Sequence, residues 1–229
     1  PFQLSINRFW VLMLAHLIAD YPLQPDRLVA AKQHLPGLSI HIAIHWVVMT
    51  LFTWPVRAII WPYILTVAIL HFGIDYFKAY MGRTRPDLVI GPYLLDQPLH
   101  WVSLIIVGIW MARSTSLPVW DVLSPWWIYG IGILIATYIW FITERVISYR
   151  DPTLQAWVVE SMWPRMSARF MLYALLVAAL PYTLLLALLV MGVITYLYHR
   201  YHYPRRWIFI DIAVALTATI IVQAILSLF

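Results

Sequence analysis

The sequence predicts an all-α protein, a polytopic transmembrane helical bundle of about seven spans, within a range of six to eight, with short interfacial helices. Hydrophobic residues make up 63% of the 229 residues and charged residues only 11%, roughly half the charged fraction of a typical soluble domain. Several apolar runs reach about 20 residues, the length that crosses the hydrocarbon core of a bilayer. These runs lack the alternation of a membrane β-strand, so a barrel is disfavoured.

Seven apolar segments are expected to form the spans. Pro22 stops the first, and Pro92 and Pro98 are expected to bend or restart the backbone near the head of the fourth. Residues 170–198 contain Pro181 near their middle, so either one long kinked span or a tight hairpin is compatible with this segment. The predicted spans, in order, are residues 7–21, 39–56, 61–80, 89–112, 126–142, 170–198 and 207–229.

The connections between these segments are more polar. Residues 23–37 are expected to form a polar connection with a short amphipathic turn, and residues 114–125 a loop or interfacial piece. Residues 144–169 are too polar to cross a membrane, and their tryptophans and arginines favour an interfacial helix. Asp211, near the start of the last span, is expected at the interface.

Four pairs of ionisable residues stand out in the first half of the chain. Each pair is separated by four positions, so on a helix both side chains lie on one face. Ionisable side chains at membrane depth are costly and therefore indicate a functional site. The pairs are His16/Asp20, His41/His45, His71/Asp75 and Asp96/His100.

Alternating helix direction is expected to bring the four pairs to one layer. The pairs fall late in the first and third spans and early in the second and fourth. Consecutive spans run in opposite directions, so these positions all lie near the same membrane face. The predicted organisation is a four-helix transmembrane core, residues 1–113, followed by additional transmembrane and interfacial helices, residues 114–229, in the same membrane domain.

This set of side chains favours a metal site near one face of the membrane. The chain has no cysteine, which excludes thiolate ligands and cysteine nucleophiles. Imidazole and carboxylate ligands suit zinc first, with manganese or iron as alternatives, and eight of them could serve a two-metal centre of the kind found in phosphoesterases. We therefore expect metal-dependent hydrolysis of a lipid or phosphoester substrate, with Asp96 as a candidate general base. The expected metal ligands are His16, Asp20, His41, His45, His71, Asp75, Asp96 and His100.

Other interpretations of the same pattern remain open. A buried polar network can hold helices together without any ligand, facing histidines can bind haem, and intramembrane His and Asp residues can line an ion or proton pathway. The non-enzymatic alternatives are therefore an accessory subunit of a larger membrane complex and a metal-ion or proton transporter. An enzyme needs an open coordination position and a cleft, whereas a structural network is closed and fully satisfied.

Charge distribution indicates location and partners. Arg and Lys are more numerous on the side of the membrane that carries the pairs, so the positive-inside rule places that side in the cytoplasm. The expected location is the bacterial inner membrane, as a multi-pass protein surrounded by membrane lipids. The sequence lacks the dense basic face that is typical of nucleic-acid-binding proteins. A homo-oligomer or a membrane-complex partner is compatible with the sequence.

Four stretches resemble an uncharacterised bacterial membrane protein family, catalogued as domain of unknown function 3307. They are HLIADYPLQPD (16–26), HIAIH (41–45), HFGIDYFKA (71–79) and LLDQPLH (94–100), with a weaker likeness in ITERVI (142–147). The resemblance covers the first half of the chain and implies a helical membrane protein without implying an activity. The helix-spaced His and Asp pairs are also distantly similar to those of membrane-bound metal-dependent hydrolases.

Overall fold

The computed structural model describes residues 2–85, 87–88, 90–114, 125–178, 183–200 and 204–228. The regular structure of these residues is entirely helical, which confirms the predicted all-α class. The chain divides into two compact units, unit 1 (Pro1–Trp127) and unit 2 (Ile128–Phe229). Residues 115–124, which cover most of the predicted loop or interfacial piece, lie outside the described part of the chain.

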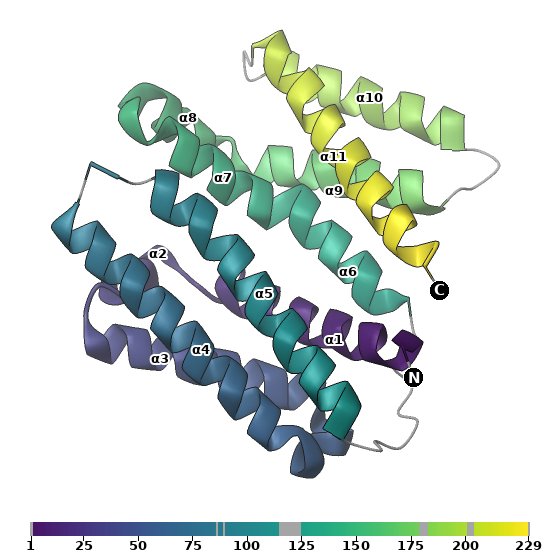
Figure 1. Cartoon of the computed structure of the whole chain (residues 1–229). Helices are drawn as coiled ribbons and strands as arrows, with labels where there is room; N and C mark the ends of the chain where they lie inside the picture. The colour runs from purple at the N-terminus through teal and green to yellow at the C-terminus, as the bar shows by residue number, and fades with distance from the viewer. Residues whose placement is uncertain are drawn as a thin grey trace. The chain divides into compact units, whose positions relative to one another are not determined.

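Unit 1 is built around a four-helix bundle in which each long helix packs against two others (Figure 1). The first helix contacts the second and fourth long helices, and the third packs between the second and fourth. These four long helices match the first four predicted spans. The elements of unit 1 are α1 (Phe2–Asp20), α2 (Asp26–Ala31), α3 (Leu35–Phe52), the 3₁₀ turn η1 (Trp54–Val56), α4 (Arg57–Thr84) and α5 (Ile90–Ser114).

Proline does not restart the backbone of α5, contrary to the expectation for its head. Pro92 lies in the first turn, where backbone N–H groups have no intrahelical partner to lose. Pro98 lies inside the helix, which nevertheless continues to Ser114. Proline is tolerated inside transmembrane helices because neighbouring groups satisfy the backbone that it frees. The pair at the start of α5 is therefore held on one continuous helix.

Gly37 allows α2 to lie close to the first turn of α3. A Cβ atom at this position would be 2.2 Å from the carbonyl oxygen of Ala31, which is far inside van der Waals contact. The close approach places Lys32, which follows α2 directly, beside α3. The absence of a side chain at Gly37 therefore determines where the charged side chain of Lys32 lies.

Unit 2 centres on α9, which packs against α10, α11 and a π-helical turn. The predicted segment 170–198 is not one continuous helix, because α9 and α10 are separate helices that lie side by side (Figure 1). Asp151 begins α8 by accepting hydrogen bonds from the backbone N–H groups of Thr153 and Leu154. The elements are α6 (Trp126–Leu134), the π-helical turn η2 (Ile135–Ile139), α7 (Trp140–Ile147), the 3₁₀ turn η3 (Ser148–Arg150), α8 (Pro152–Glu160), α9 (Met162–Ala178), α10 (Thr183–Arg200) and α11 (Arg205–Leu226).

A buried ion network links the helices of unit 2. Arg165 donates to both carboxylate oxygens of Glu144, at 2.8 and 2.5 Å, and to both oxygens of Asp211, at 2.9 and 2.6 Å. Arg169 donates to Asp211 Oδ1 at 2.7 Å and to the carbonyl oxygen of Ala136, in the π-helical turn, at 2.7 Å. All four charged residues are at most 5% exposed. The two guanidinium groups balance the two carboxylates, so this network is charge-neutral.

This network bears on the polar segment before the sixth predicted span. Asp211, which is expected at the membrane interface, is buried in the network, and Arg165 and Arg169 are among the largest fully buried side chains. Residues 144–169 therefore do not form one exposed interfacial helix. They form the end of α7, all of α8 and the start of α9, with Arg165 and Arg169 buried and Arg150 exposed.

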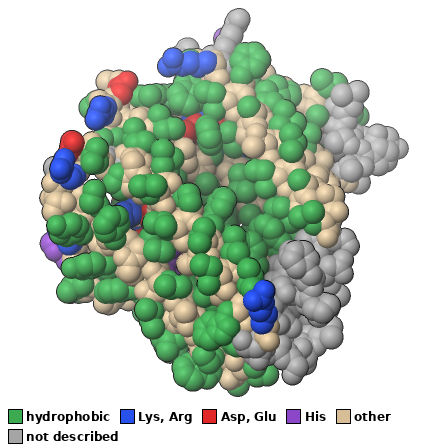
Figure 2. All heavy atoms as spheres, viewed as in Figure 1, with side chains coloured by type: hydrophobic (Ala, Val, Ile, Leu, Met, Phe, Trp, Pro, Cys, Tyr) green, Lys and Arg blue, Asp and Glu red, His purple; other side chains and the backbone are tan. Residues whose placement is uncertain are grey.

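Within the described part of the chain, five helical segments are long and apolar enough to cross a membrane. The expected count of about seven is not confirmed, since α1 and α10 contribute only the shorter apolar stretches Phe9–Asp20 and Ala187–Tyr196 to this set. The face drawn in Figure 2 has many hydrophobic side chains and few charged ones. The five segments are Leu35–Phe52, Trp54–Thr84, Ile90–Met111, Trp126–Arg150 and Arg206–Leu226.

Candidate metal centre

The four predicted pairs meet inside the unit 1 bundle. His16 and Asp20 lie in the last two turns of α1, and the pair on α3 lies near the middle of that helix. The pair on α4 begins at the middle of its helix, and the pair on α5 lies in the first half of its helix. Seven of the eight residues are buried, and the Asp20 side chain is 9% exposed. The predicted common layer is therefore present in the structure.

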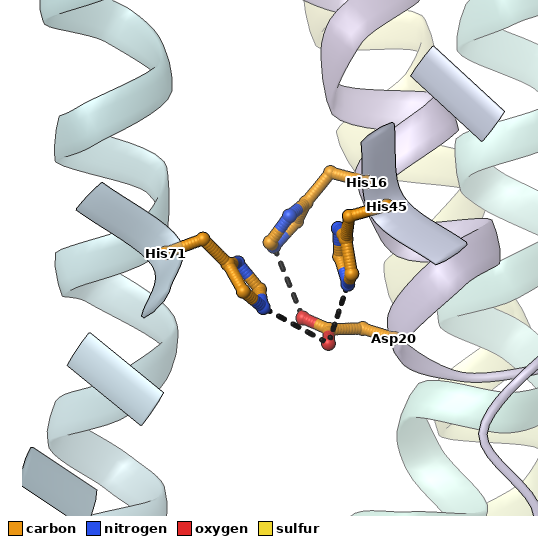
Figure 3. Close-up of side chains that lie close together, drawn as sticks. All are labelled: His16, Asp20, His45 and His71. Carbon is orange, nitrogen blue, oxygen red and sulfur yellow. Dashed lines mark hydrogen bonds and ion pairs between the residues drawn. The ribbon is translucent and has the colours of Figure 1, made fainter. Parts of the chain in front are cut away.

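Asp20 is the carboxylate that most imidazoles contact. Its Oδ2 atom is 3.1 Å from His16 Nε2, and its Oδ1 atom is 3.1 Å from His45 Nε2 and 3.2 Å from His41 Nε2. His71 Nε2 lies 3.8 Å from the same Oδ1. Figure 3 shows His16, His45 and His71 pointing toward Asp20 from three helices. The i,i+4 pairing of His16 with Asp20 thus forms one side of a four-residue group.

Asp75 is the second shared carboxylate. Its Oδ2 atom is 3.2 Å from His41 Nε2 and 3.5 Å from His71 Nε2. The two imidazoles are also close to each other, with 3.1 Å between their Nε2 atoms. His100 Nε2 lies 4.0 Å from Asp75 Oδ1. Asp75 therefore connects the imidazoles of α3 and α4 to α5.

Asp96 lies at the α5 side of the cluster. His100 Nδ1 is 3.3 Å from Asp96 Oδ1 and 2.9 Å from the Asp96 carbonyl oxygen. Gln97 Nε2 donates to Asp96 Oδ2 at 3.2 Å, and Lys78 Nζ forms an ion pair with the same oxygen. This carboxylate is therefore held by a lysine and an amide as well as by its own helix.

Three overlapping groups of these residues could hold a metal ion. In each group one ligand atom per residue lies within 4.8 Å of the others. His71 belongs to two of the groups and Asp75 to two, so all eight predicted residues form one connected set. Whether they bind a metal as ligands stays a prediction. The groups are His16/Asp20/His45/His71, His41/His71/Asp75 and Asp75/Asp96/His100.

The imidazoles turn the same atom inward. The Nε2 atoms of His16, His41, His45 and His71 face the carboxylates of Asp20 or Asp75. Their Nδ1 atoms are buried and have no hydrogen-bond partner among the described residues. Any ligand atom that these four histidines offer to the centre is therefore Nε2.

Both lysines of the chain lie at this cluster. Lys32 Nζ is 2.8 Å from Asp75 Oδ2, 3.2 Å from His41 Nε2 and 3.3 Å from Gln24 Oε1. Lys78 pairs with Asp96, and Gln97 donates to the same carboxylate. Lys32 was not predicted, although one signal was available: 13 of the 15 basic residues are arginine, and the two lysines both lie near the His and Asp pairs.

The net charge of this cluster differs from that of the ion network in unit 2. Three aspartates and two lysines leave one negative charge when the imidazoles are neutral, whereas the unit 2 network is balanced. An uncompensated buried charge is strongly destabilising. The cluster in unit 1 is thus electrostatically suited to accept a cation, and the unit 2 network is not.

The fold and the cluster define an all-helical protein with membrane-length helices and a buried His/Asp group that could bind metal. The family model described as "Protein of unknown function (DUF3307)" matches residues 9–126, which is more than half of the chain. The chain belongs to this family. The matched region contains all eight cluster residues and both lysines, and it ends before the ion network of unit 2.

The other comparisons added no relative. No curated protein and no solved structure matched the chain. The expected likeness to membrane-bound metal-dependent hydrolases therefore finds no support in these comparisons. Any activity has to be argued from the cluster itself.

Proposed function

We propose that this chain is an integral membrane protein that binds one divalent metal ion and uses it to hydrolyse a phosphoester or lipid-linked substrate. The observation that carries the proposal is the convergence of three imidazoles and one carboxylate from three helices (Figure 3). Four such ligands match the usual coordination number and donor atoms of zinc. Manganese and iron accept the same donors and are the alternatives. The ion would be held by His16, Asp20, His45 and His71.

Charge favours one ion in place of the two that eight ligands suggest. One divalent cation would change the cluster from one excess negative charge to one excess positive charge. Two would leave three positive charges in a buried site, at a large desolvation cost. A single ion with one anionic ligand makes the site neutral.

The lysines favour the four-residue group over the other two. The ammonium group of Lys32 already lies beside His41 and Asp75, and that of Lys78 lies beside Asp96. No lysine contacts Asp20 among the interactions of the described residues. The remaining cluster residues, His41, Asp75, Asp96 and His100, would then surround the ion site without being required as its ligands.

A divalent ion held by these residues would supply a Lewis acid for an ester or phosphoryl oxygen and for a water molecule. Asp96 shares no ligand group with Asp20, so its carboxylate would be available to accept a proton as general base. Lys78 and Gln97 would fix its orientation. General-base catalysis typically contributes 10²–10⁴-fold to a rate.

The proposed membrane location and orientation of the protein rest on the membrane-length helices and on the basic residues at the end of unit 1 that lies nearer to the cluster. Arg27, Arg83 and Arg85 are exposed at this end, and Arg57 and Arg113 at the other. The positive-inside rule then places the cluster at the cytoplasmic leaflet. We propose the bacterial inner membrane, with membrane lipids around the bundle, and a homo-oligomer or a complex with another membrane protein is compatible with this arrangement.

Transport is less well supported than hydrolysis. A proton or metal pathway requires polar groups that continue across the membrane. Beyond the cluster, the buried residues of the bundle include Leu12, Ile64 and Leu104, all apolar. Among the described residues, no His, Asp, Glu, Lys or Arg side chain is buried in unit 1 outside the cluster. A non-enzymatic accessory role would keep the metal and lack turnover.

The hydrolase proposal is tested with the full chain in nanodiscs, loaded with Zn²⁺, Mn²⁺ or Fe²⁺ and given chromogenic phosphomonoesters and phosphodiesters and a phosphatidic acid. We expect hydrolysis that a chelator abolishes. Asp96→Asn should retain metal and lose at least about 10²-fold in rate, whereas exposed His199→Ala should match wild type. Metal-loaded protein that hydrolyses none of these substrates would contradict the proposal and favour the accessory role.

A further inference from the structure

A cavity of about 400 Å³ lies between the α2–α3 connection and the end of α4. Lys32, Gln33 and His34 line it from the connection, and Tyr76 and Arg83 line it from α4. It therefore has two positively charged side chains in its wall, and no carboxylate belongs to the lining formed by the described residues. The wall has the composition of an anion site.

Lys32 belongs both to this cavity and to the candidate metal centre. Its Nζ atom is 2.8 Å from Asp75 Oδ2 and 3.2 Å from His41 Nε2. The Lys32 side chain is 12% exposed, so it separates the cavity from the cluster without being sealed inside. A ligand that contacts Lys32 from the cavity is thus one side chain away from the second ligand group.

Arg83 supplies the other charge. One of its N–H groups donates to the carbonyl oxygen of Gln33, which holds the guanidinium against the cavity wall. A guanidinium has five N–H donors in a planar fork, so this bond leaves donors for a ligand. Planar forks bind phosphate and carboxylate oxygens with two parallel hydrogen bonds. His34 and Gln33 add polar side chains to the same wall.

We propose that this cavity binds a phosphate-type anion and is the subsite that holds the charged group of the substrate next to the metal centre. The inference rests on the proposed function and names its substrate class, a compound with a phosphate group, whether a soluble ester or a lipid headgroup. The positive charges that attract the anion, Lys32 and Arg83, lie in the cavity wall itself.

The test measures binding of inorganic phosphate to the full chain in zwitterionic nanodiscs by isothermal titration calorimetry. The metal-free His45→Ala background prevents phosphate from binding to a metal ion instead. We expect saturable binding that weakens about tenfold or more in Arg83→Gln, the loss of one charged hydrogen-bonding partner. Arg85→Gln is the matched control, since Arg85 is exposed two residues away and does not line the cavity, and it should bind phosphate as the parent does.

Absence of saturable phosphate binding, or equal weakening by Arg83→Gln and Arg85→Gln, would overturn the proposal. Binding in the metal-free background keeps the anion subsite testable even if the metal proposal fails. A short-chain phosphatidic acid that displaces phosphate at much lower concentration supports the subsite with a lipid headgroup as its ligand. Displacement only at concentrations similar to those of phosphate supports it with a soluble phosphate compound.

Discussion

Asp20 and Lys32 have opposite roles in the cluster at the scale of single residues. Asp20 is within 3.8 Å of four imidazole Nε2 atoms and has no lysine partner among the described contacts. Lys32 places an ammonium group beside Asp75 and His41, where it has the charge that a second metal ion would otherwise supply. Asp20 is therefore available to a metal ion, whereas Asp75 and His41 already have a cation beside them. This difference is why we propose one ion for eight potential ligands.

Lys32→Met tests this explanation. Removing the ammonium group leaves two excess negative charges in the cluster, and one divalent ion neutralises them. We therefore expect the single ion to bind about tenfold or more tightly, measured as Zn²⁺ affinity by competition with a chelator, while the metal content stays at one ion per chain. Arg27→Met, which removes an exposed positive charge nearby, should leave the affinity as in wild type. An unchanged or weaker affinity in Lys32→Met would show that Lys32 does not control the charge of the metal site.

The ion network of unit 2 stabilises α7, α9 and α11 at the scale of helices. Arg165 contacts two carboxylates from two other helices, and Trp157 and Trp207 lie 5.1 and 4.7 Å from its guanidinium carbon. The π-helical turn supplies the Ala136 carbonyl oxygen that accepts from Arg169. The charges of this network are balanced by its own members, as expected of a structural element.

Arg165→Met is expected to destabilise unit 2 strongly. It leaves Glu144 and Asp211 buried without their main partner, and breaking a buried ion pair on one side costs about 3–5 kcal/mol. Denaturant unfolding followed by circular dichroism in detergent measures this loss. Exposed Arg150→Met should change the free energy of unfolding by no more than about 0.5 kcal/mol. Similar stabilities of the two variants would contradict a structural role for the network.

Local patterns predict the helices and the candidate site better than they predict the long-range contacts. The four-residue spacing and alternating helix direction were sufficient to predict that all eight residues meet. Arg165 contacts Glu144 and Asp211 across 21 and 46 positions, and no periodic pattern marks such partners. The same limit applies to Lys32, whose position depends on how α2 packs against α3 at Gly37. The break between α9 and α10 was left open because a proline is compatible with either a kink or a hairpin.

The whole molecule is proposed to sit in the membrane with the metal centre toward the cytoplasm. The α4 helix has 28 residues and is therefore roughly 42 Å long, enough to cross a hydrocarbon core of about 30 Å. Arg57 begins this helix, and Arg83 lies in its last turn. These two residues should then face opposite sides of the membrane.

Because the chain has no cysteine, single cysteines can report this orientation directly. Arg57→Cys should react with a membrane-impermeant maleimide added outside spheroplasts. Arg27→Cys and Arg83→Cys should react only after the membrane is opened. Labelling of positions 57 and 83 from the same side would contradict a membrane-spanning α4, and a reversed pattern would contradict the cytoplasmic position of the cluster.

Metal content is the most direct test of the central claim that the His/Asp cluster is a metal centre. Wild-type protein purified without chelator should contain one divalent ion per chain by mass spectrometry. His45→Ala should lose that ion while retaining wild-type helicity by circular dichroism, and exposed His199→Ala should retain it. A wild-type protein that stays metal-free even after incubation with Zn²⁺, Mn²⁺ and Fe²⁺, or a folded His45→Ala that keeps the full metal content, would contradict the account.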